Sequence, residues 1–503
     1  MKKLILIIAA TMLAAVEIQG QRIGCMRTDN LTRASDYYLL PEPYKFDPQK
    51  TYRVPVVLFS FSDNDFSMSN PAAYYNRIFN ETGFNNGMGR GCVADYFRDQ
   101  SGGRVNLVFD IYGPVKIKEK AWTKIAYRSG VTERSQALDG LSKITQADFS
   151  IYDWDGKGEA NIVLFLAAGY CGNQKSGYGY LYPNTGYFFK KLPGDIDIYI
   201  SSLSCELWKD DETCGIGTII HEFCHFLGLP DIYPTVKNDD YLSVVDQWDL
   251  MDGGNYVNYG WCPPNLTAME RMYLGWASPE ELTEATTIEG MKSLEEGGKT
   301  YIVRSSDNGD EFYLLENRQQ VGWDYGCPGN GLLIYHVDFK MDDWRNNQVN
   351  NNSAHFGYDL FHADGKAYNV WDPKGGGIDA CEWAMKGHLR SNFLSTTPYP
   401  YTDPVSLVVN NRLTDDSSPA ATLFPKSNVS PPRFMGKAIT NIRMADDGTI
   451  AFDFMKPDEM GIAPIATSDE ASDVWYAIDG RRLPDKPTKK GMYILKGKGK
   501  VIF

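Results

Sequence analysis

The stretch TIIHEFCHFLGLPDIY, residues 218–233, places ionisable side chains inside an apolar segment. In a helix, residues four apart lie on one face, so His221 and His225 present their imidazoles about one turn apart. Glu222 lies about 100° around the same helix, beside that pair. Burying three such groups without partners would cost on the order of several kcal/mol. The stretch therefore predicts a helix whose polar groups share a ligand, in preference to a plain core helix.

The HExxH spacing suits one Zn²⁺ ion. Two imidazole nitrogens bind zinc at about 2.0–2.1 Å, and the adjacent glutamate accepts a proton from a zinc-bound water. A catalytic zinc takes three protein ligands and keeps a fourth position for water. Gly228 and Pro230 end the helix in a sharp turn, which returns the following residues toward the histidines. The predicted site comprises a general base, Glu222, and three zinc ligands, His221, His225 and Asp231.

Asp231 stands where the longer motif HExxHxxGxxH has its third histidine. A carboxylate oxygen is an acceptable zinc ligand, at about 2.0–2.2 Å. Alternatively, Asp231 caps the turn or orients a histidine, because aspartate is common in turns. The third ligand would then come from Asp239, Asp240 or Asp249.

A second turn follows the motif. Met251 precedes a Gly-Gly pair 26 residues after His225, where long-motif zincins have a methionine turn beneath the metal. The turn sequence alone is common. Only its distance from the HExxH motif supports the interpretation as a methionine turn. Tyr256 is a candidate oxyanion donor, although packing is its simpler role.

The region before the motif alternates strand and helix patterns, which is typical of an α/β layer. Its strands are expected at 53–61, 105–115 and 160–169, and its helices at 71–80, 92–103 and 134–145. Beyond residue 285, short apolar runs are separated by Gly, Asn, Asp and Pro clusters, which indicates a β-rich module. The predicted organisation is a signal peptide (1–20), an N-terminal segment (21–50), a catalytic domain (51–284), a β-rich domain (285–456), and a linker with a C-terminal β-hairpin-like tail (457–503).

Residues 1–20 have two lysines followed by an apolar run. This pattern is typical of a cleaved secretory signal, and the run is too short to span a bilayer. We therefore expect a protein without a membrane span that acts outside a bacterial cell or on its surface.

The net charge limits the possible binding partners, and the cysteine count limits the possible disulfides. The formal net charge is −14 and no long basic patch is present, which argues against a nucleic-acid partner because phosphate binding needs concentrated positive charge. The chain has nine cysteines, so at least one lacks a partner within the chain. Cys205 and Cys214 flank a short polar loop and are candidates for a disulfide, with buried free thiols as the alternative.

Two further segments suggest accessory roles. DWDGKGE (153–159) resembles acidic calcium loops, but Leu164 stands where such a loop needs a glutamate. Structural Ca²⁺ is one interpretation and a plain Asp/Gly turn the simpler one. Residues 474–503 show two strand patterns around a Pro/Lys turn and resemble C-terminal modules of secreted bacterial proteins that can serve in sorting.

Taken together, these segments resemble the immune inhibitor A family of secreted metallopeptidases, a metzincin-like group. The resemblance covers roughly residues 50–455 and is carried by GTIIHEFCHFLGLPDIY, QWDLMDGG, PPNLTAMERMYLGW, YLLENRQQVGWD and GLLIYHVD. It implies a zincin fold, zinc held by His221, His225 and Asp231, and Glu222 as the base. Cys224 within the zinc helix departs from the family pattern, and we interpret it as buried packing.

The resulting expectation is a secreted zinc endopeptidase that hydrolyses peptide bonds of extracellular proteins. Its fold class would be α/β or α+β, with a metzincin-like catalytic domain, a β-rich domain and a small β tail. Two alternatives stay open: a zinc hydrolase of glycopeptides or mucin-type substrates, and a non-catalytic surface-binding protein on the same fold. Protein or peptide partners follow from either hydrolase, and the oligomeric state is left open.

Overall fold

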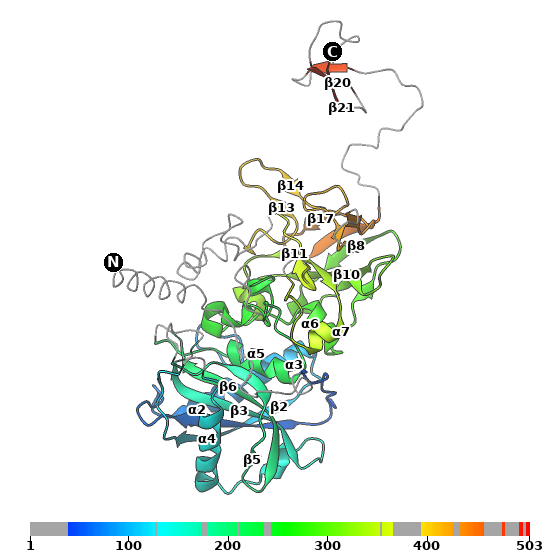
Figure 1. The fold of residues 1–503 in the computed structure, drawn as a ribbon. Coiled ribbons are helices and arrows are strands. Elements are labelled where there is room, and N and C mark those ends of the chain that lie inside the picture. The colour runs from blue at the N-terminus through cyan, green and yellow to red at the C-terminus, as the bar shows by residue number, and fades with distance from the viewer. Residues whose placement is uncertain are drawn as a thin grey trace, which may run out of the picture. The chain divides into compact units, whose positions relative to one another are not determined.

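The computed structural model shows a chain that divides into two compact units, Met1–Lys456 and Pro457–Phe503 (Figure 1). The residues it describes are 39–125, 128–170, 172, 179–208, 211–235, 243–352, 355–365, 394–425, 432–456, 475–477, 492–495 and 499–502. The predicted signal peptide, residues 1–20, lies outside these ranges.

A mostly parallel sheet forms the first part of unit Met1–Lys456. Its strand order is β2-β1-β3-β6-β4, with β5 also pairing with β6. Strands β1, β2, β3 and β6 run parallel, whereas β4 and β5 are antiparallel to β6. The strands are β1 (Tyr52–Ser60), β2 (Leu107–Lys116), β3 (Glu159–Tyr170), β4 (Asn184–Tyr187), β5 (Lys191–Leu192) and β6 (Ile196–Leu207). The sheet therefore ends in β4, an antiparallel edge strand.

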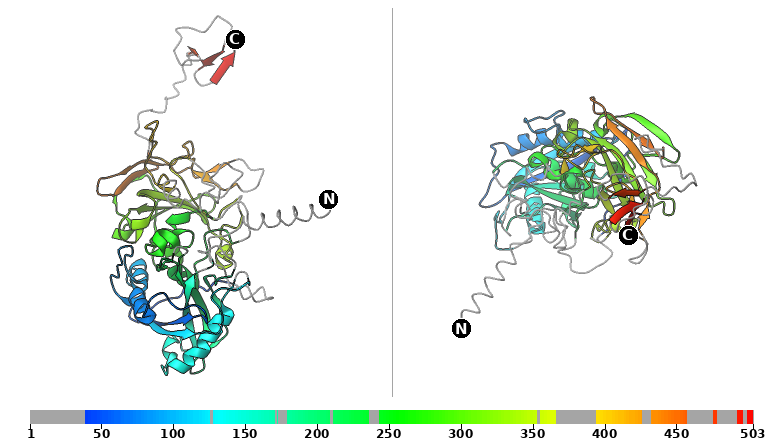
Figure 2. Two further views of the ribbon diagram at one scale, coloured as in Figure 1. Left: turned by 90° about the vertical axis from the view of Figure 1, so that its left-hand side faces the viewer. Right: turned by 90° about the horizontal axis from the view of Figure 1, so that it is seen from above.

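Helices cover both faces of this sheet (Figures 1 and 2). Because side chains alternate along a strand, β1 sends Val54, Val56 and Leu58 to one core and Val57 and Phe59 to the other. The first core also contains side chains of three helices: α2 (Pro71–Asn80), α3 (Val93–Gln100) and α5 (Gly217–Phe226). The second contains those of α4 (Val131–Ile144) and the short helix η1 (Phe149–Tyr152). The expectation of a mixed α/β fold is thereby confirmed.

The expected strands and helices before the motif are present with small shifts at their ends. Helix α2 begins at Pro71, where proline fits because the first helical N–H has no partner within the helix, and the Asn70 side chain accepts from the Ala73 N–H. Helix α3 begins after Cys92, whose sulfur accepts from Asp95 N, and Asp95 in turn accepts from Cys92 N. These local caps explain why the helix starts were readable from sequence.

Beyond Tyr273 the chain is dominated by short antiparallel strands. One sheet has the order β12-β11-β10-β9-β7 and another the order β17-β18-β8. Their strands are β7 (Glu280–Glu281), β8 (Thr286–Met291), β9 (Tyr301–Arg304), β10 (Glu311–Arg318), β11 (Gly331–Asp338), β12 (Tyr358–Leu360), β17 (Ile439–Met444) and β18 (Ile450–Phe454). Two hairpins are formed by β13 (Tyr401–Thr402) with β14 (Val409–Asn410) and by β15 (Thr422–Leu423) with β16 (Arg433–Phe434). Before this region, after α5, come η2 (Asp246–Trp248), η3 (Gly254–Gly260) and α6 (Ala268–Tyr273). The helical elements within it are η4 (Leu294–Glu296), η5 (Gly322–Gly326) and α7 (Met341–Arg345).

One apolar core joins the α/β part to the β-rich part. It contains Phe223 of α5 and Trp248 of η2 together with Leu314 of β10 and Tyr335 of β11. Packing is therefore continuous across residues 284 and 285, where the sequence suggested a change of domain. Among the residues that the structure describes, every helix is too short or too polar to cross a bilayer.

Unit Pro457–Phe503 contains a small antiparallel sheet of order β19-β20-β21. Its strands are β19 (Trp475–Ala477), β20 (Met492–Leu495) and β21 (Gly499–Ile502). The expected pair of strands is present as β19 and β20, and β21 adds a third strand that the hairpin-like expectation did not include.

Candidate metal centre

Helix α5 carries the two histidines and is buried along its whole length. It packs against β4, β6 and η3. At its first residue, Gly217, a Cβ atom would lie 2.1 Å from the carbonyl oxygen of Asn255, so only glycine permits this approach to η3. Helix α5 therefore lies between strands β4 and β6 on one side and η3 on the other.

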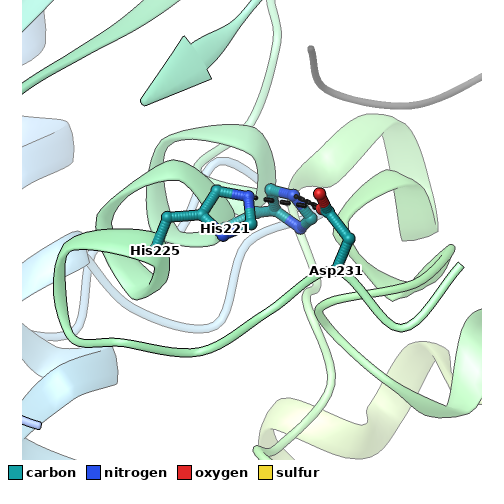
Figure 3. A group of neighbouring side chains, drawn as sticks. All are labelled: His221, His225 and Asp231. Carbon is teal, nitrogen blue, oxygen red and sulfur yellow. Dashed lines mark ion pairs between the residues drawn. The ribbon is translucent and has the colours of Figure 1, made fainter. Parts of the chain in front are cut away.

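His221, His225 and Asp231 converge on one point (Figure 3). One ligand atom from each lies within 4.8 Å of the other two. Asp231 Oδ1 is 3.2 Å from Nε2 of His221 and 3.3 Å from Nε2 of His225. The structure thus brings together all three residues that the sequence suggested as ligands.

The opposite ring nitrogens set the protonation of both histidines. Nδ1 of His221 is 3.0 Å from the carbonyl oxygen of Leu250, and Nδ1 of His225 is 2.8 Å from that of Leu229. A carbonyl oxygen only accepts, so each Nδ1 carries the hydrogen and donates it. In the neutral rings both Nε2 atoms therefore present lone pairs toward the carboxylate of Asp231.

This arrangement fits a metal ion. Nε2 of His221 and Oδ1 of Asp231 are buried and make no hydrogen bond with the described residues. With zinc–ligand bonds of about 2.0–2.2 Å, tetrahedral zinc ligands stand about 3.3 Å apart, close to the spacing of both Nε2 atoms from the carboxylate. Three converging lone pairs repel one another unless a cation lies between them. The donor set and its spacing therefore suit a divalent transition metal.

The charges of the site reinforce this fit. Burial raises the pKa of Asp231, but the charge and hydrogen bonds that the two histidines supply when protonated outweigh it, so the pKa lies well below its usual value. For His221, burial lowers the pKa and the Asp231 carboxylate raises it, with a net rise. Asp231 is thus held ionised, the form in which a carboxylate binds a metal.

The turn after α5 returns the chain to the histidines. Gly228 has φ of +98°, and a Cβ there would lie 2.5 Å from the carbonyl oxygen of Pro41. A side chain is thus excluded both by the backbone angle and by the passing N-terminal segment. Beyond the turn, the Ile232 N–H donates to the carbonyl of Met251 and fixes the loop that bears Asp231.

An asparagine-rich run, residues 346–352, orients the third ligand. Asn347 donates its amide N–H to Asp231 Oδ2 (2.7 Å) and accepts from the Asp231 backbone N–H (2.6 Å). Asn350 donates to the carbonyl of Ile232, and Asn351 accepts from Thr235 N. Oδ2 is occupied by this amide, which leaves Oδ1 for a metal. Sequence reasoning missed these residues, although the repeated asparagines were a visible signal.

Glu222 lies beside the histidines and faces the edge strand. Its Oε2 is 2.8 Å from the Thr185 hydroxyl of β4, and its carbonyl oxygen is 2.7 Å from the same hydroxyl. The Ser202 hydroxyl of β6 is 2.8 Å from Thr185 Oγ1. Strands β4 and β6 thus fix the position of Glu222. No local sequence pattern predicts this contact.

The loop containing Met251 contacts His221 through Leu250, and the methionine turn stays a prediction. Met251 is fully buried and follows Leu250, the hydrogen-bond partner of His221. Asp249 is equally buried, but it accepts from Met251 N and contacts Glu270 of α6. Asp249 is therefore no substitute ligand in this arrangement.

The remaining candidates have other positions. Tyr256 stacks edge-to-face on Trp208, which agrees with a packing role. Asp239 and Asp240 lie outside the described residues. Cys224 is fully buried in the first core, where burial raises the pKa of its thiol.

The suggested disulfide is absent from the structure. Cys205 and Cys214 are both free thiols. The Cys214 N–H donates to the carbonyl of Glu206, so the register places Glu206, and not Cys205, opposite Cys214. Both side chains pack against the second apolar core as unpaired thiols, which agrees with the alternative of buried free thiols.

The acidic loop 153–159 uses its carboxylates internally. Asp153 accepts from the backbone N–H groups of Lys157 and Gly158. Asp155 accepts from the Tyr44 hydroxyl and the Asn161 amide. Within the described ranges, His221, His225 and Asp231 form the one group of three such residues that could hold a metal, so no calcium cluster is found in this loop.

Compared with known proteins, the chain matches neither a protein-family model nor a curated protein.

Proposed function

We propose that this protein is a zinc-dependent endopeptidase that acts outside the cell. The observation that carries the proposal is the convergence of two imidazole nitrogens and one carboxylate oxygen beside Glu222. The sequence resemblance to immune inhibitor A-like peptidases, with their zincin fold, supports the same activity. The signal-like residues 1–20 support secretion.

The donor set and Glu222 together favour zinc and hydrolysis. Two histidines and one carboxylate also bind Fe(II) in oxygenases, but such sites need no general base next to a ligand. A zinc ion held by His221, His225 and Asp231 would supply a Lewis acid that polarises the scissile carbonyl and acidifies water. Glu222, the residue next to His221 on α5, would accept the proton of the attacking water and deliver it to the leaving amine.

We place the substrate along β4. This strand is the edge of the sheet, runs antiparallel to β6 and contacts α5. An extended peptide gains main-chain hydrogen bonds by adding to such an edge. Thr185 of β4 already reaches Glu222, so a peptide beside this strand lies next to the general base.

Metal analysis with a caseinolysis assay tests the proposal. Purified protein is expected to contain one zinc ion per chain and to cleave casein. Glu222→Gln should retain the zinc and lose about 10²–10⁴-fold in kcat, the contribution typical of a general base. An iron-loaded protein, or a fully active Glu222→Gln variant, would contradict the assignment, and zinc without any cleavage would favour a non-catalytic binding protein.

A second candidate, cleavage of glycopeptides, is favoured by aromatic side chains beside β4. Tyr187 and Phe189 stack with ring centroids 6.4 Å apart at 6°, and Tyr199 packs edge-to-face on Tyr187. Phe189 is 67 % exposed. Sugar rings pack on exposed aromatic faces, so these three residues offer a platform next to the proposed peptide path. If mucin-type glycopeptides are the substrates, Phe189→Ala should raise KM for them and leave casein cleavage unchanged.

A further inference from the structure

An apolar tip projects from the β13–β14 hairpin (Figure 1). Its aliphatic side chains are exposed to 91 % at Val405, 73 % at Leu407, 65 % at Val408 and 51 % at Val409. Single exposed aliphatic residues are ordinary on protein surfaces, but four within five positions are not. SLVV (406–409) is one of the short apolar runs from which the sequence predicted a β-rich module, and in the structure it forms the tip of a surface hairpin and the start of β14.

The backbone N–H groups of the tip are used within the hairpin itself. Asp403 Oδ1 accepts from the N–H groups of Val405 (3.0 Å) and Ser406 (2.7 Å). The Leu407 N–H donates to the Asp403 carbonyl (2.9 Å), and Asp403 N donates to the carbonyl of Val408 (2.9 Å). The Val408 N–H donates to Ser406 Oγ at 3.4 Å. Pro404 has no N–H group, so every backbone N–H from residue 403 to residue 408 has an acceptor within the hairpin.

Leu407 adopts a conformation that its side chain disfavours. Its φ is +60°, in the left-handed region where a branched residue is strained. Asparagine or glycine would fit this position with less strain, yet a leucine stands there and is exposed. Strain at an exposed apolar residue points to a role for that side chain outside the fold.

The base of the hairpin is fixed to the rest of the protein. The side-chain amide of Asn410 donates to the carbonyl oxygens of Ala363 (2.7 Å) and Ser418 (2.9 Å). The tip is therefore already ordered in the free protein, so binding to a partner loses little further conformational entropy.

We propose that the hairpin tip, residues 403–409, inserts into the interfacial region of a lipid bilayer. A bilayer accepts a convex projection without a matching pocket, and it disfavours backbone N–H groups that are not already bonded. The tip carries four aliphatic side chains and one formal charge, Asp403, whose carboxylate serves as the acceptor described above. Because the chain has a net charge of −14, zwitterionic lipid is the matching surface.

Flotation with phosphatidylcholine vesicles tests this insertion. The protein without its signal-like residues 1–20 should float with the vesicles, and its partition coefficient should not fall when NaCl is raised to about 1 M, because the contact is apolar. The double variant Val405→Asp/Leu407→Asp should lower the partition coefficient at least about tenfold, since two aliphatic side chains no longer enter the apolar phase.

A matched double variant controls for added charge. Ile125 and Ile144 are exposed aliphatic residues outside the hairpin, at 68 % and 55 %. Ile125→Asp/Ile144→Asp should partition as the wild type does, and all three proteins should share one melting temperature. Absence of vesicle binding, or equal partitioning of the hairpin variant, would overturn the proposal. So would a wild-type dimer, seen by sedimentation velocity without lipid, that the hairpin variant dissociates, because the tip would then bind a second copy.

Discussion

The hydroxyl of Thr185 lies 2.8 Å from Oε2 of Glu222 and 2.7 Å from its carbonyl oxygen. One hydroxyl has one hydrogen, so Thr185 donates to one of these two oxygens at a time, and the Ser202 hydroxyl lies 2.8 Å from Thr185 Oγ1 and 3.4 Å from the Glu222 carbonyl oxygen. The edge strand that we assign to substrate binding thus also positions the proposed base.

Thr185→Val keeps the shape of this side chain and removes its hydroxyl. We expect kcat for casein to fall about 10-fold or more, because the carboxylate loses a fixed orientation, while KM and zinc content stay near wild type. Thr185→Ser retains the hydroxyl and should restore most of kcat. Steady-state kinetics with metal analysis decides the matter, and a Thr185→Val enzyme with only KM changed would assign this residue to substrate binding instead.

Asn347→Ala should weaken the metal site without touching a ligand. The amide of Asn347 holds Asp231 through two hydrogen bonds, and loss of such a partner typically costs about 10–100-fold in metal affinity. Competition with a fluorescent zinc chelator measures the change. Gln348→Ala, at an exposed neighbouring position, should bind zinc as the wild type does. Equal affinities in both variants would contradict the role given to Asn347.

The buried carboxyl pair of Asp249 and Glu270 should make stability depend on pH. Burial raises the pKa of Glu270 from 4.5 to about 7, and burial followed by the charge of Glu270 raises that of Asp249. Asp249 Oδ2 and Glu270 Oε1 have no hydrogen-bond donor among the described residues other than the facing carboxyl group.

Between pH 4.5 and 7 the folded protein therefore binds more protons than the unfolded chain, and its free energy of unfolding falls as the pH rises. Protonated Glu270 contributes on the order of 3 kcal/mol to the free energy of unfolding. This contribution is fully present below pH 4.5 and disappears as the pH rises through about 7. Urea unfolding of chelator-treated protein should show this slope, and Glu270→Gln should flatten it. A stability that rises over the same interval in metal-free protein would contradict the raised pKa of Glu270.

Gly228→Ala should damage the turn that returns Asp231 to the histidines. The added Cβ would face a disfavoured φ and the carbonyl oxygen of Pro41, at a cost on the order of 2 kcal/mol. Both the melting temperature and the zinc affinity are expected to fall. Gly309→Ala, where the Cβ meets nothing within 4 Å, should leave both unchanged.

The sequence was sufficient for features that depend on neighbouring residues. The four-residue spacing of His221 and His225 defines one helix face, and Gly228 with Pro230 defines the turn. Strand β1 and helices α2 and α3 were likewise readable, because alternation and capping are local properties.

What the sequence left out depends on contacts between distant segments. Thr185 and Glu222 are 37 residues apart, and Asn347 and Asp231 are 116 apart. Neither residue belongs to a spacing motif, because the pairing arises only when β4 and the asparagine-rich run fold against α5. The exposed position of SLVV (406–409) was not readable for a related reason: its composition suits a strand interior, but its hydrogen bonds to Asp403 form a tip.

The core shared by α5, η2, β10 and β11 has a consequence for how the chain can be divided. A fragment ending near residue 284 would expose Phe223 and Trp248 to water and lose the partners of the helix that bears both histidines. We expect limited proteolysis in that region to yield no stable, separately active half, and heating to melt both parts in one transition. The helix that bears His221 and His225 therefore depends on strands β10 and β11 for its packing.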